Sequence, residues 1–282
     1  QQEITHTLSQ QLRKIMSEQV GIFKTTDGLF AAQKTIKELY FAVVETTSKF
    51  FVIISIVIGF FIISSIIKSN RRKRERELIS SVTSLSRGTN SELFLILQLL
   101  KSGIPPVTIF HDLIIKKKNN EFSQIDLVLV TSEGIIVIEV KDYSGWIYGS
   151  GNNTNWTKVL SYGRKKYKFY NPIKQNNNHI SELRKTLNQF ENIPFFSVIV
   201  FFGDCELKEI NYVPKGTYLV KSHRVFEVLN LIKNENEPTQ YTNKREVVDK
   251  LKELVSLGEN TDYQKQHIEN IKDMVGKDRI FK

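Results

Sequence analysis

Hydrophobic residues form one long uninterrupted run and a series of shorter runs along the chain. The long run, FFVIISIVIGFFIISSII, covers residues 50–67 and contains no charged residue. At ~1.5 Å per residue, a helix of this length is about 27 Å long, which is enough to cross the apolar core of a bilayer. We therefore expect a single transmembrane helix over residues 49–68.

A buried core helix and a cleaved signal peptide are the two alternatives to a membrane span. A core helix seldom stays apolar on all sides over 18 residues, because one face normally meets water. A signal peptide has a shorter apolar region, a small-residue cleavage site and a position closer to the N-terminus. Both alternatives fit the run less well than a membrane span does.

Basic residues are concentrated on the C-terminal side of the apolar run. Only Lys34, Lys37 and Lys49 precede it within a similar distance. The basic residues that follow it are Lys68, Arg71, Arg72, Lys73, Arg74 and Arg76. The positive-inside rule then predicts a single-pass protein of the cell membrane with its C-terminal side in the cytoplasm. Residues 1–48 become an N-terminal extracytoplasmic helical segment. The basic linker, residues 69–90, is expected to contact anionic lipid, with nucleic-acid binding as the alternative.

The chain beyond the linker alternates between helical and strand periodicity. Helices are predicted at 91–103, with Ser91 as the N-cap, and at 171–190, 222–234, 244–257 and 262–275. Strands are predicted at 107–115, 124–132, 135–143, 155–160, 165–170, 195–204 and 217–220. Glycines predict turns around residues 146–150. This order of elements predicts an α/β domain with a mixed sheet flanked by helices.

Composition narrows the class of partner. The chain has 282 residues, of which 25% are charged and 40% are hydrophobic, and its net charge is +10. A basic chain favours a polyanionic partner, either nucleic acid or an anionic membrane surface. The single cysteine, Cys205, excludes an intrachain disulfide and suits a reducing compartment. One cysteine and five histidines give no recognisable zinc-ligand spacing.

Charged residues stand at the end of the most apolar predicted strand, in IIVIEVKDYSGW at residues 135–146. Glu139 and Lys141 are two residues apart, so they project from the same face of the strand. If the preceding hairpin turns at 132–134, residues 126 and 140 are roughly opposite, and Asp126 lies beside both Glu139 and Lys141. Two carboxylates and an ammonium group then converge at one end of the sheet.

This convergence has a catalytic and a purely structural interpretation. Two adjacent carboxylates repel each other, and their hard oxygen atoms suit Mg²⁺ or Mn²⁺. A divalent cation binds phosphate oxygens and acidifies a bound water, and a neighbouring lysine stabilises the charge that develops on phosphorus. The alternative is a surface salt bridge, Asp126–Lys141 or Glu139–Lys141, worth ~0–1 kcal/mol.

The motifs Q-I-D, I-E-V-K-x-Y-x-G, Trp156 and N-P-x-x-Q-x-x-x-H follow one another over about residues 88–205. In this order they resemble the nuclease-related domain, NERD, of the PD-(D/E)xK nuclease superfamily. The resemblance implies a restriction-endonuclease-like sheet, with Asp126 and Glu139 as the metal ligands. The Val140 carbonyl is a further ligand in that scheme, and Lys141 assists the attacking water.

Further residues take expected roles from the same resemblance. Glu92 is an outer ligand, although Ser91 precedes it where the family usually has glycine. Gln175 contacts phosphate or the catalytic groups, whereas His179 fits a capped or core histidine better. Trp146 and Trp156 could stack on bases, but aromatic residues in short hairpins more often pack. Two basic patches could neutralise backbone phosphates or be ordinary solvated turns. The patches are Lys116, Lys117 and Lys118, and Arg164, Lys165 and Lys166.

The function expected from these features is that of a membrane-anchored, Mg²⁺- or Mn²⁺-dependent nuclease with DNA as its substrate. Residues 91–205 would form the nuclease-like domain and residues 206–282 a C-terminal strand and helices. A homo-oligomer is left open. The alternative is a non-catalytic, membrane-tethered DNA-binding or assembly protein.

Overall fold

The computed structural model describes residues 10, 11, 14, 26–116, 122–160, 163–190, 192–239 and 244–259. The chain divides into two compact units, Gln1–Arg72 and Lys73–Lys282. The helix predicted at 262–275 and most of the segment 1–25 lie outside the described residues.

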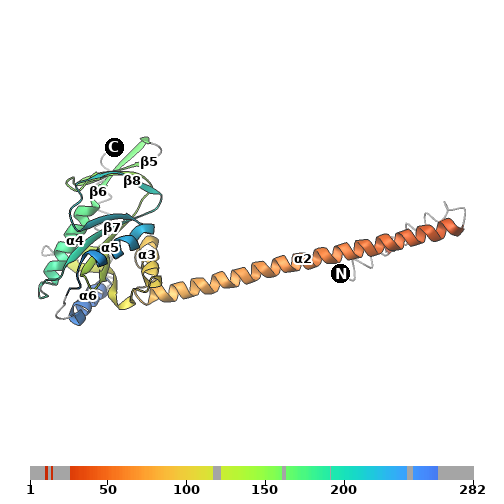
Figure 1. Ribbon diagram of the computed structural model, residues 1–282, viewed down its shortest axis with the longest axis horizontal. Helices are drawn as coiled ribbons and strands as arrows, with labels where there is room; N and C mark the ends of the chain where they lie inside the picture. The colour runs from red at the N-terminus through yellow and green to blue at the C-terminus, as the bar shows by residue number, and fades with distance from the viewer. Residues whose placement is uncertain are drawn as a thin grey trace. The chain divides into compact units, whose positions relative to one another are not determined.

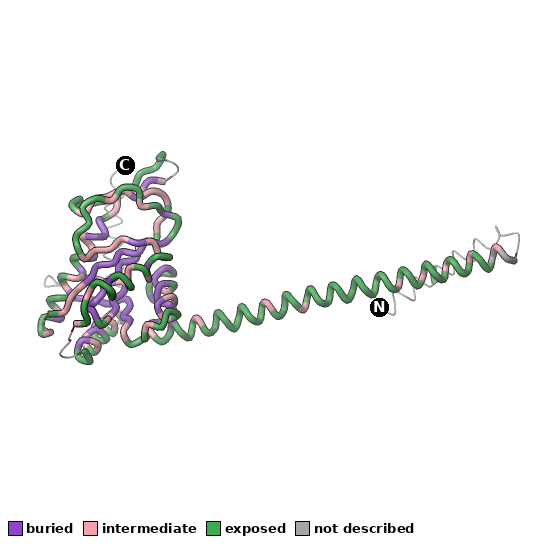
Figure 2. Tube along the Cα trace, viewed as in Figure 1, coloured by how far each residue is buried: buried purple, intermediate pink, exposed green. Residues whose placement is uncertain are grey.

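A single uninterrupted helix contains the apolar run. Helix α2, Thr26–Ser80, is 55 residues long and joins the amphipathic segment before residue 50 directly to the apolar run. Its most apolar 18-residue window has a mean hydropathy of 2.9 and no buried residue. Figure 2 shows the helix exposed along almost its whole length. By length and composition, α2 is therefore a candidate membrane span.

The larger of two sheets has five strands in the order β1-β2-β3-β7-β9. The strands are β1 Ile109–Lys116, β2 Phe122–Val130, β3 Ile135–Asp142, β7 Phe195–Phe202 and β9 Thr217–Lys221. Strands β1, β2 and β3 pair in antiparallel fashion, whereas β3, β7 and β9 run parallel to one another. The predicted mixed sheet is confirmed.

A second sheet of four strands follows the order β6-β5-β4-β8. Its strands are β4 Gly145–Ser150, β5 Asn155–Leu160, β6 Lys165–Tyr170 and β8 Cys205–Asn211. The predicted turn at Gly151 is present directly after residues 146–150, but Gly145 and Gly149, expected to mark turns as well, lie within β4. Strand β8 was missed because its sequence, CELKEIN, contains three charged residues and the strand lies half-exposed at the edge of the sheet.

Helices cover both faces of the five-stranded sheet (Figure 1). Helices α3, Asn90–Lys101, and α5, Val225–Glu235, pack on the face formed by Ile136 and Ile138. Helices α4, Pro172–Thr186, and α6, Lys244–Glu259, pack on the face formed by Ile135 and Val137. The continuous apolar run of β3 is thus explained, because a strand covered on both faces needs no polar side. Two short 3-10 turns, Pro106–Thr108 and Ser222–Arg224, complete the fold.

A third apolar cluster joins the two sheets. Trp156 of β5 is buried and stacks on Phe201 of β7, with ring centroids 6.5 Å apart and planes 5° apart. Its indole Nε1 donates a hydrogen bond to the Ser150 carbonyl at 2.9 Å. Cys205 is buried in the same cluster. Trp156 therefore packs the core, which was the alternative to base stacking.

Candidate functional site

Glu139, Lys141 and Gln175 meet at the C-terminal end of β3. The Lys141 Nζ donates to Glu139 Oε1 at 2.6 Å and to Gln175 Oε1 at 3.1 Å. Glu139 is 1% exposed, so its carboxylate is almost entirely removed from water. The predicted convergence of the E-x-K side chains, and the approach of Gln175 from α4, are both present in the structure.

The N-terminus of α4 is fixed by a buried asparagine. The Asn171 side-chain oxygen caps the helix by accepting hydrogen bonds from the backbone N–H groups of Ile173 and Lys174. Its amide nitrogen donates to the carbonyls of Ser150, Gly151 and Asn153 at 3.0, 3.1 and 2.7 Å. This double anchorage ties α4 to the second sheet, and Gln175 lies one turn further along the helix.

Asp126 lies where β2 separates from β3. The ladder between these strands ends at the pair Leu127↔Ile138. Its register differs by one residue from the predicted one, since its continuation would pair residue 126 with 139 rather than 140. Beyond the ladder, the Asp126 Oδ2 accepts a hydrogen bond from the Val140 backbone N–H at 2.7 Å. The side chain thereby replaces a lost backbone pair and stays at the end of β3.

Burial, together with the charges around Asp126, raises the pKa of its carboxyl group well above the ordinary value. Loss of hydration is the largest cause, and the negative charges of Glu139 and Glu92 add to it. The Val140 hydrogen bond and the Lys141 charge act in the opposite direction but are weaker. Glu139 and Glu92 therefore lie close enough for their charges to disfavour ionisation of Asp126.

The second oxygen of Glu139 has no hydrogen-bond partner among the described residues. It lies 3.3 Å from His179 Nε2, but the two atoms are not aligned for a hydrogen bond, and Nε2 is equally unsatisfied. The other ring nitrogen of His179 lies 2.8 Å from the Ser123 hydroxyl. Buried carboxylate oxygens normally have a partner, so this oxygen is available to a ligand.

Lys141 is held as a cation by its neighbours. Burial lowers the pKa of this ammonium group, but the charge and hydrogen bond of Glu139 outweigh burial, and the pKa is raised overall. The Glu139–Lys141 pair corresponds to one of the two salt bridges considered from the sequence. It is not a surface pair, however, because the two side chains are only 2% and 16% exposed.

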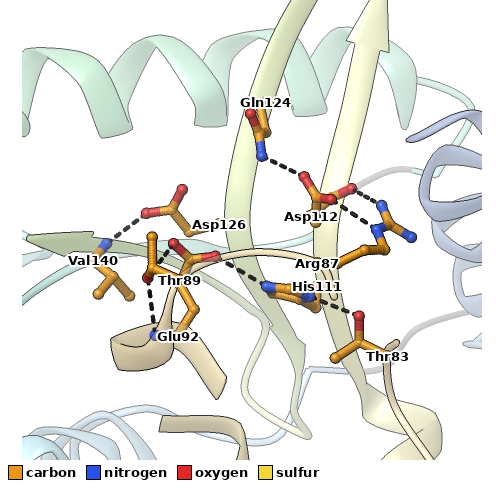
Figure 3. A network of polar contacts seen from close by, with 9 residues as sticks. All are labelled: Thr83, Arg87, Thr89, Glu92, His111, Asp112, Gln124, Asp126 and Val140. Carbon is orange, nitrogen blue, oxygen red and sulfur yellow. Dashed lines mark hydrogen bonds and ion pairs between the residues drawn. The ribbon is translucent and has the colours of Figure 1, made fainter. Parts of the chain in front are cut away.

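Glu92 enters the site from the first turn of α3. Thr89, rather than Ser91, is the N-cap of this helix, and it accepts a hydrogen bond from the Glu92 backbone N–H. The Thr89 hydroxyl also donates to Glu92 Oε1 at 2.7 Å, and His111 Nε2 lies 3.0 Å from Glu92 Oε2 (Figure 3). Burial raises the pKa of Glu92, but the His111 and Thr89 hydrogen bonds outweigh it, so the pKa is lowered overall.

The donor set fits a hard divalent cation. The described residues contain no cluster of three or more His, Cys, Asp or Glu side chains that could hold a metal ion. Magnesium needs no such cluster, because one or two carboxylates with water and phosphate oxygens complete its shell. The repulsion on Asp126 and the unsatisfied oxygen of Glu139 are the features that a cation at this position would relieve.

The basic patches lie at the edges of two different sheets. Lys116 is exposed at the end of β1, whereas Arg164, Lys165 and Lys166 are exposed at the start of β6. Lys117 and Lys118 lie outside the described residues. Among the described residues, no hydrogen bond or ion pair joins a member of these patches to Asp126, Glu139 or Lys141.

A buried polar pair, His111 and Asp112, was missed by reasoning from the sequence. The pair interrupts the apolar strand IFHDLIIK, in which every residue except Lys116 is buried. The sequence did contain a signal for this pair. In an alternating strand only one of two adjacent residues faces solvent, so at least one of His111 and Asp112 had to be buried.

The fold and site define a class of protein: an α/β domain with carboxylates and a lysine at the end of a mixed sheet. Residues 87–202 match the family model of the nuclease-related domain, NERD. The match confirms the resemblance drawn from the motifs.

A curated relative has the same region. An uncharacterized protein of Bacillus anthracis is 32% identical over 112 residues, which cover 40% of this chain and 51% of the relative. The chain thus aligns with about half the length of that relative. No solved structure matches this chain.

Proposed function

We propose that this protein is a membrane-anchored, divalent-metal-dependent nuclease that hydrolyses phosphodiester bonds of nucleic acid, with DNA as the first substrate to test. The observation that carries the proposal is the convergence of Asp126, Glu139 and Lys141 at the end of β3. The match of residues 87–202 to a nuclease-related domain supports it.

In this proposal, Asp126 and Glu139 would hold Mg²⁺ or Mn²⁺. When bound, the cation supplies charge neutralisation at the phosphate and lowers the pKa of a bound water. Glu92 would reach the same region from α3 as an outer ligand, acting through water. The unpartnered Glu139 oxygen and the mutual repulsion of the carboxylates are the structural features in favour.

Lys141 would act as a hydrogen-bond donor rather than as a base. Its ammonium group is held between Glu139 Oε1 and Gln175 Oε1, so its direction is fixed by two acceptors. The third proton of the ammonium group is left for the attacking water or a phosphate oxygen. Gln175 would then position Lys141 and limit its rotation.

Nucleic acid would be attracted by the positive charge of the chain, which is +10 overall. The basic patches at residues 116–118 and 164–166 are the proposed phosphate contacts, and their contribution should weaken as salt increases. The basic flank after the apolar run would orient α2 so that the domain faces the cytoplasm. Cleavage would then be confined to nucleic acid near the membrane.

The test uses the full chain, purified in detergent. Plasmid, linear duplex, single-stranded DNA and RNA are each incubated with Mg²⁺, Mn²⁺ or EDTA. We expect metal-dependent cleavage that falls by about 10²–10³-fold in Lys141→Ala, the scale of losing an electrostatic stabiliser. Lys208→Ala, which removes an exposed lysine paired with Glu206, is the matched control.

Two results would redirect the assignment. Cleavage by Lys141→Ala at the wild-type rate would show that another site carries the activity. Nucleic-acid binding without cleavage under every condition would instead favour the non-catalytic, tethering alternative.

A further inference from the structure

The linker between α2 and α3 is built into the candidate site. Three of its side chains, Thr83, Arg87 and Thr89, reach polar groups beside the carboxylates (Figure 3). Thr83 and Arg87 are themselves buried. A segment that only connected two helices would have no need for buried polar side chains, since each costs free energy unless it is paired.

One chain of contacts runs from Thr83 to Glu92. The Thr83 hydroxyl lies 2.8 Å from His111 Nδ1, and His111 Nε2 lies 3.0 Å from Glu92 Oε2. The Thr89 hydroxyl donates to the other oxygen, Oε1, at 2.7 Å. Both oxygens of Glu92 are therefore held by partners that depend on the linker.

A second set of contacts holds β1 opposite Asp126. Arg87 donates through Nε to Asp112 Oδ2 at 2.8 Å and through Nη2 to the Asp112 carbonyl at 2.9 Å. The Gln124 side chain donates to the remaining oxygen, Oδ1. Asp112 has a φ of +58°, in the left-handed region that few non-glycine residues adopt. The pairs His111↔Leu127 and Leu113↔Ile125 flank it, so Asp112 faces the backbone position of Asp126.

Gly88 makes the close approach of the linker possible. Its φ is +70°, and a Cβ atom at this position would collide with Glu92 Oε2 and the His111 ring. The linker thus lies directly against the Glu92–His111 pair, and a side chain here would displace it.

We propose that Thr83, Arg87 and Thr89 are positioning residues of the nuclease site, so that the segment directly following the candidate membrane helix sets the geometry of the carboxylates. This inference rests on the proposed function. Thr83 and Thr89 act through Glu92, and Arg87 acts through the Asp112 backbone beside Asp126. None of the three residues contacts the substrate.

Thr83 offers the cleanest variant. Thr83→Val keeps the side-chain shape and removes only the hydroxyl, whereas loss of Arg87 would leave the buried Asp112 unpaired and endanger folding. Thr83→Ser restores the hydroxyl. Ser84→Ala is the matched control, because the Ser84 hydroxyl is exposed and contacts only Ser86 of the linker.

Thr89→Asp provides a second, independent variant. Aspartate caps helices as well as threonine does, so α3 keeps its N-cap. It carries no hydroxyl to donate to Glu92, and its negative charge faces that carboxylate. A fall in activity without unfolding would therefore report on Glu92 rather than on the helix.

The experiment measures kcat, the KM for DNA, the melting temperature and the Mn²⁺ affinity of the full chain in detergent. For Thr83→Val we expect kcat and Mn²⁺ affinity to fall about 10-fold, as for partners that orient metal ligands, with KM unchanged. The melting temperature should fall by a few degrees, because the buried His111 Nδ1 loses its partner. Thr83→Ser and Ser84→Ala should behave as wild type, and Thr89→Asp should show a loss at least as large as that of Thr83→Val.

The outcomes separate this inference from the proposed function. If the wild type cleaves DNA and both Thr83→Val and Thr89→Asp match it in kcat and Mn²⁺ affinity, the positioning role is overturned while the nuclease stands. If the wild type cleaves no substrate, the proposed function fails. The positioning role is then judged from Mn²⁺ affinity alone. A selective loss of affinity in Thr83→Val then supports positioning of the carboxylates, and unchanged affinity overturns it.

Discussion

Lys141 depends on a single amide for its orientation. Besides the Glu139 carboxylate, the Lys141 ammonium group donates to Gln175 Oε1, at 3.1 Å. Gln175→Leu keeps the side-chain volume and removes this acceptor, so the ammonium group gains rotational freedom. We expect kcat for DNA cleavage to fall about 10-fold, at the low end for a group that aligns a catalytic residue. Steady-state kinetics would measure it, with Asn177→Ala, an exposed position of the same helix, as the control.

Ionisation of Asp126 should lower the stability of the folded protein, because its carboxyl group is buried near other carboxylates. The pKa of its carboxyl group is higher in the folded protein than in the unfolded chain, so the folded state binds this proton more tightly. Its ionisation therefore lowers stability as pH rises from the unfolded pKa through the folded pKa. Asp126→Asn removes the charge and keeps an oxygen for the Val140 N–H. We expect it to raise the melting temperature at neutral pH by about 2–4 °C, the shift for roughly 1 kcal/mol in a domain of this size.

Thermal unfolding followed over a range of pH checks this prediction. The difference between Asp126→Asn and wild type should shrink as pH falls and vanish below the unfolded pKa of aspartate, where both side chains are neutral. Mn²⁺ should stabilise the wild type and leave Asp126→Asn nearly unaffected, because a ligand stabilises only the state that binds it. A variant less stable than wild type at neutral pH would contradict the repulsion argument.

Alternation along a strand made part of the site predictable from the sequence. Glu139 and Lys141 had to share a face, and the helix motif brought Gln175 to them. The contacts of the linker were not predictable, because they join Thr83 to His111 and Arg87 to Asp112 across 28 and 25 residues. No local periodicity relates positions so far apart, and only the folded arrangement of β1 against the linker brings them together.

At the scale of elements, the long and strongly patterned segments were predicted best. Strands β3 and β7 begin with apolar runs and are covered on both faces, and β1 and β2 are rich in β-branched and other apolar residues, so composition indicates strands in all four. Strands β4 and β8 were not predicted, because neither has a clear hydrophobic pattern. Their strand conformation depends on pairing with each other in the second sheet. The register of β2 against β3 also depends on strand pairing. The turn residues alone left it uncertain by one position.

Loss of the buried N-cap of α4, Asn171, should lower the free energy of unfolding strongly. Asn171 is fully buried and joins α4 to three carbonyl groups at the end of β4 and in the turn that follows it. Asn171→Ala removes the cap, worth ~1 kcal/mol, and leaves buried carbonyls with fewer donors. We expect the free energy of unfolding to fall by about 2–3 kcal/mol, measured by chemical denaturation. Asn152→Ala, an exposed change in the neighbouring turn, should stay within ~0.5 kcal/mol of wild type.

At the scale of the whole molecule, the apolar run and the nuclease-related domain belong to different compact units. The sequence predicts a membrane span from the apolar run and its basic flank. The structure adds that the run lies within one continuous helix. In the proposed single-pass arrangement, charge would set the orientation, because basic residues are retained on the cytoplasmic side during insertion. The flank Lys68–Arg76 carries six such residues, whereas only Lys34, Lys37 and Lys49 precede the run within a similar distance.

The orientation can be measured with cysteines placed on either side of the run. Cys205→Ser removes the native thiol, and Thr35→Cys or Ser84→Cys then supplies a single reporter. We expect a membrane-impermeant maleimide to label Thr35→Cys in intact cells, and to label Ser84→Cys only after the membrane is opened. The reverse pattern would place the nuclease-related domain outside the cell and remove cytoplasmic nucleic acid as its substrate. Labelling of both sites in intact cells would instead show that α2 does not span the membrane, since two sites on opposite sides of a bilayer cannot both be exposed.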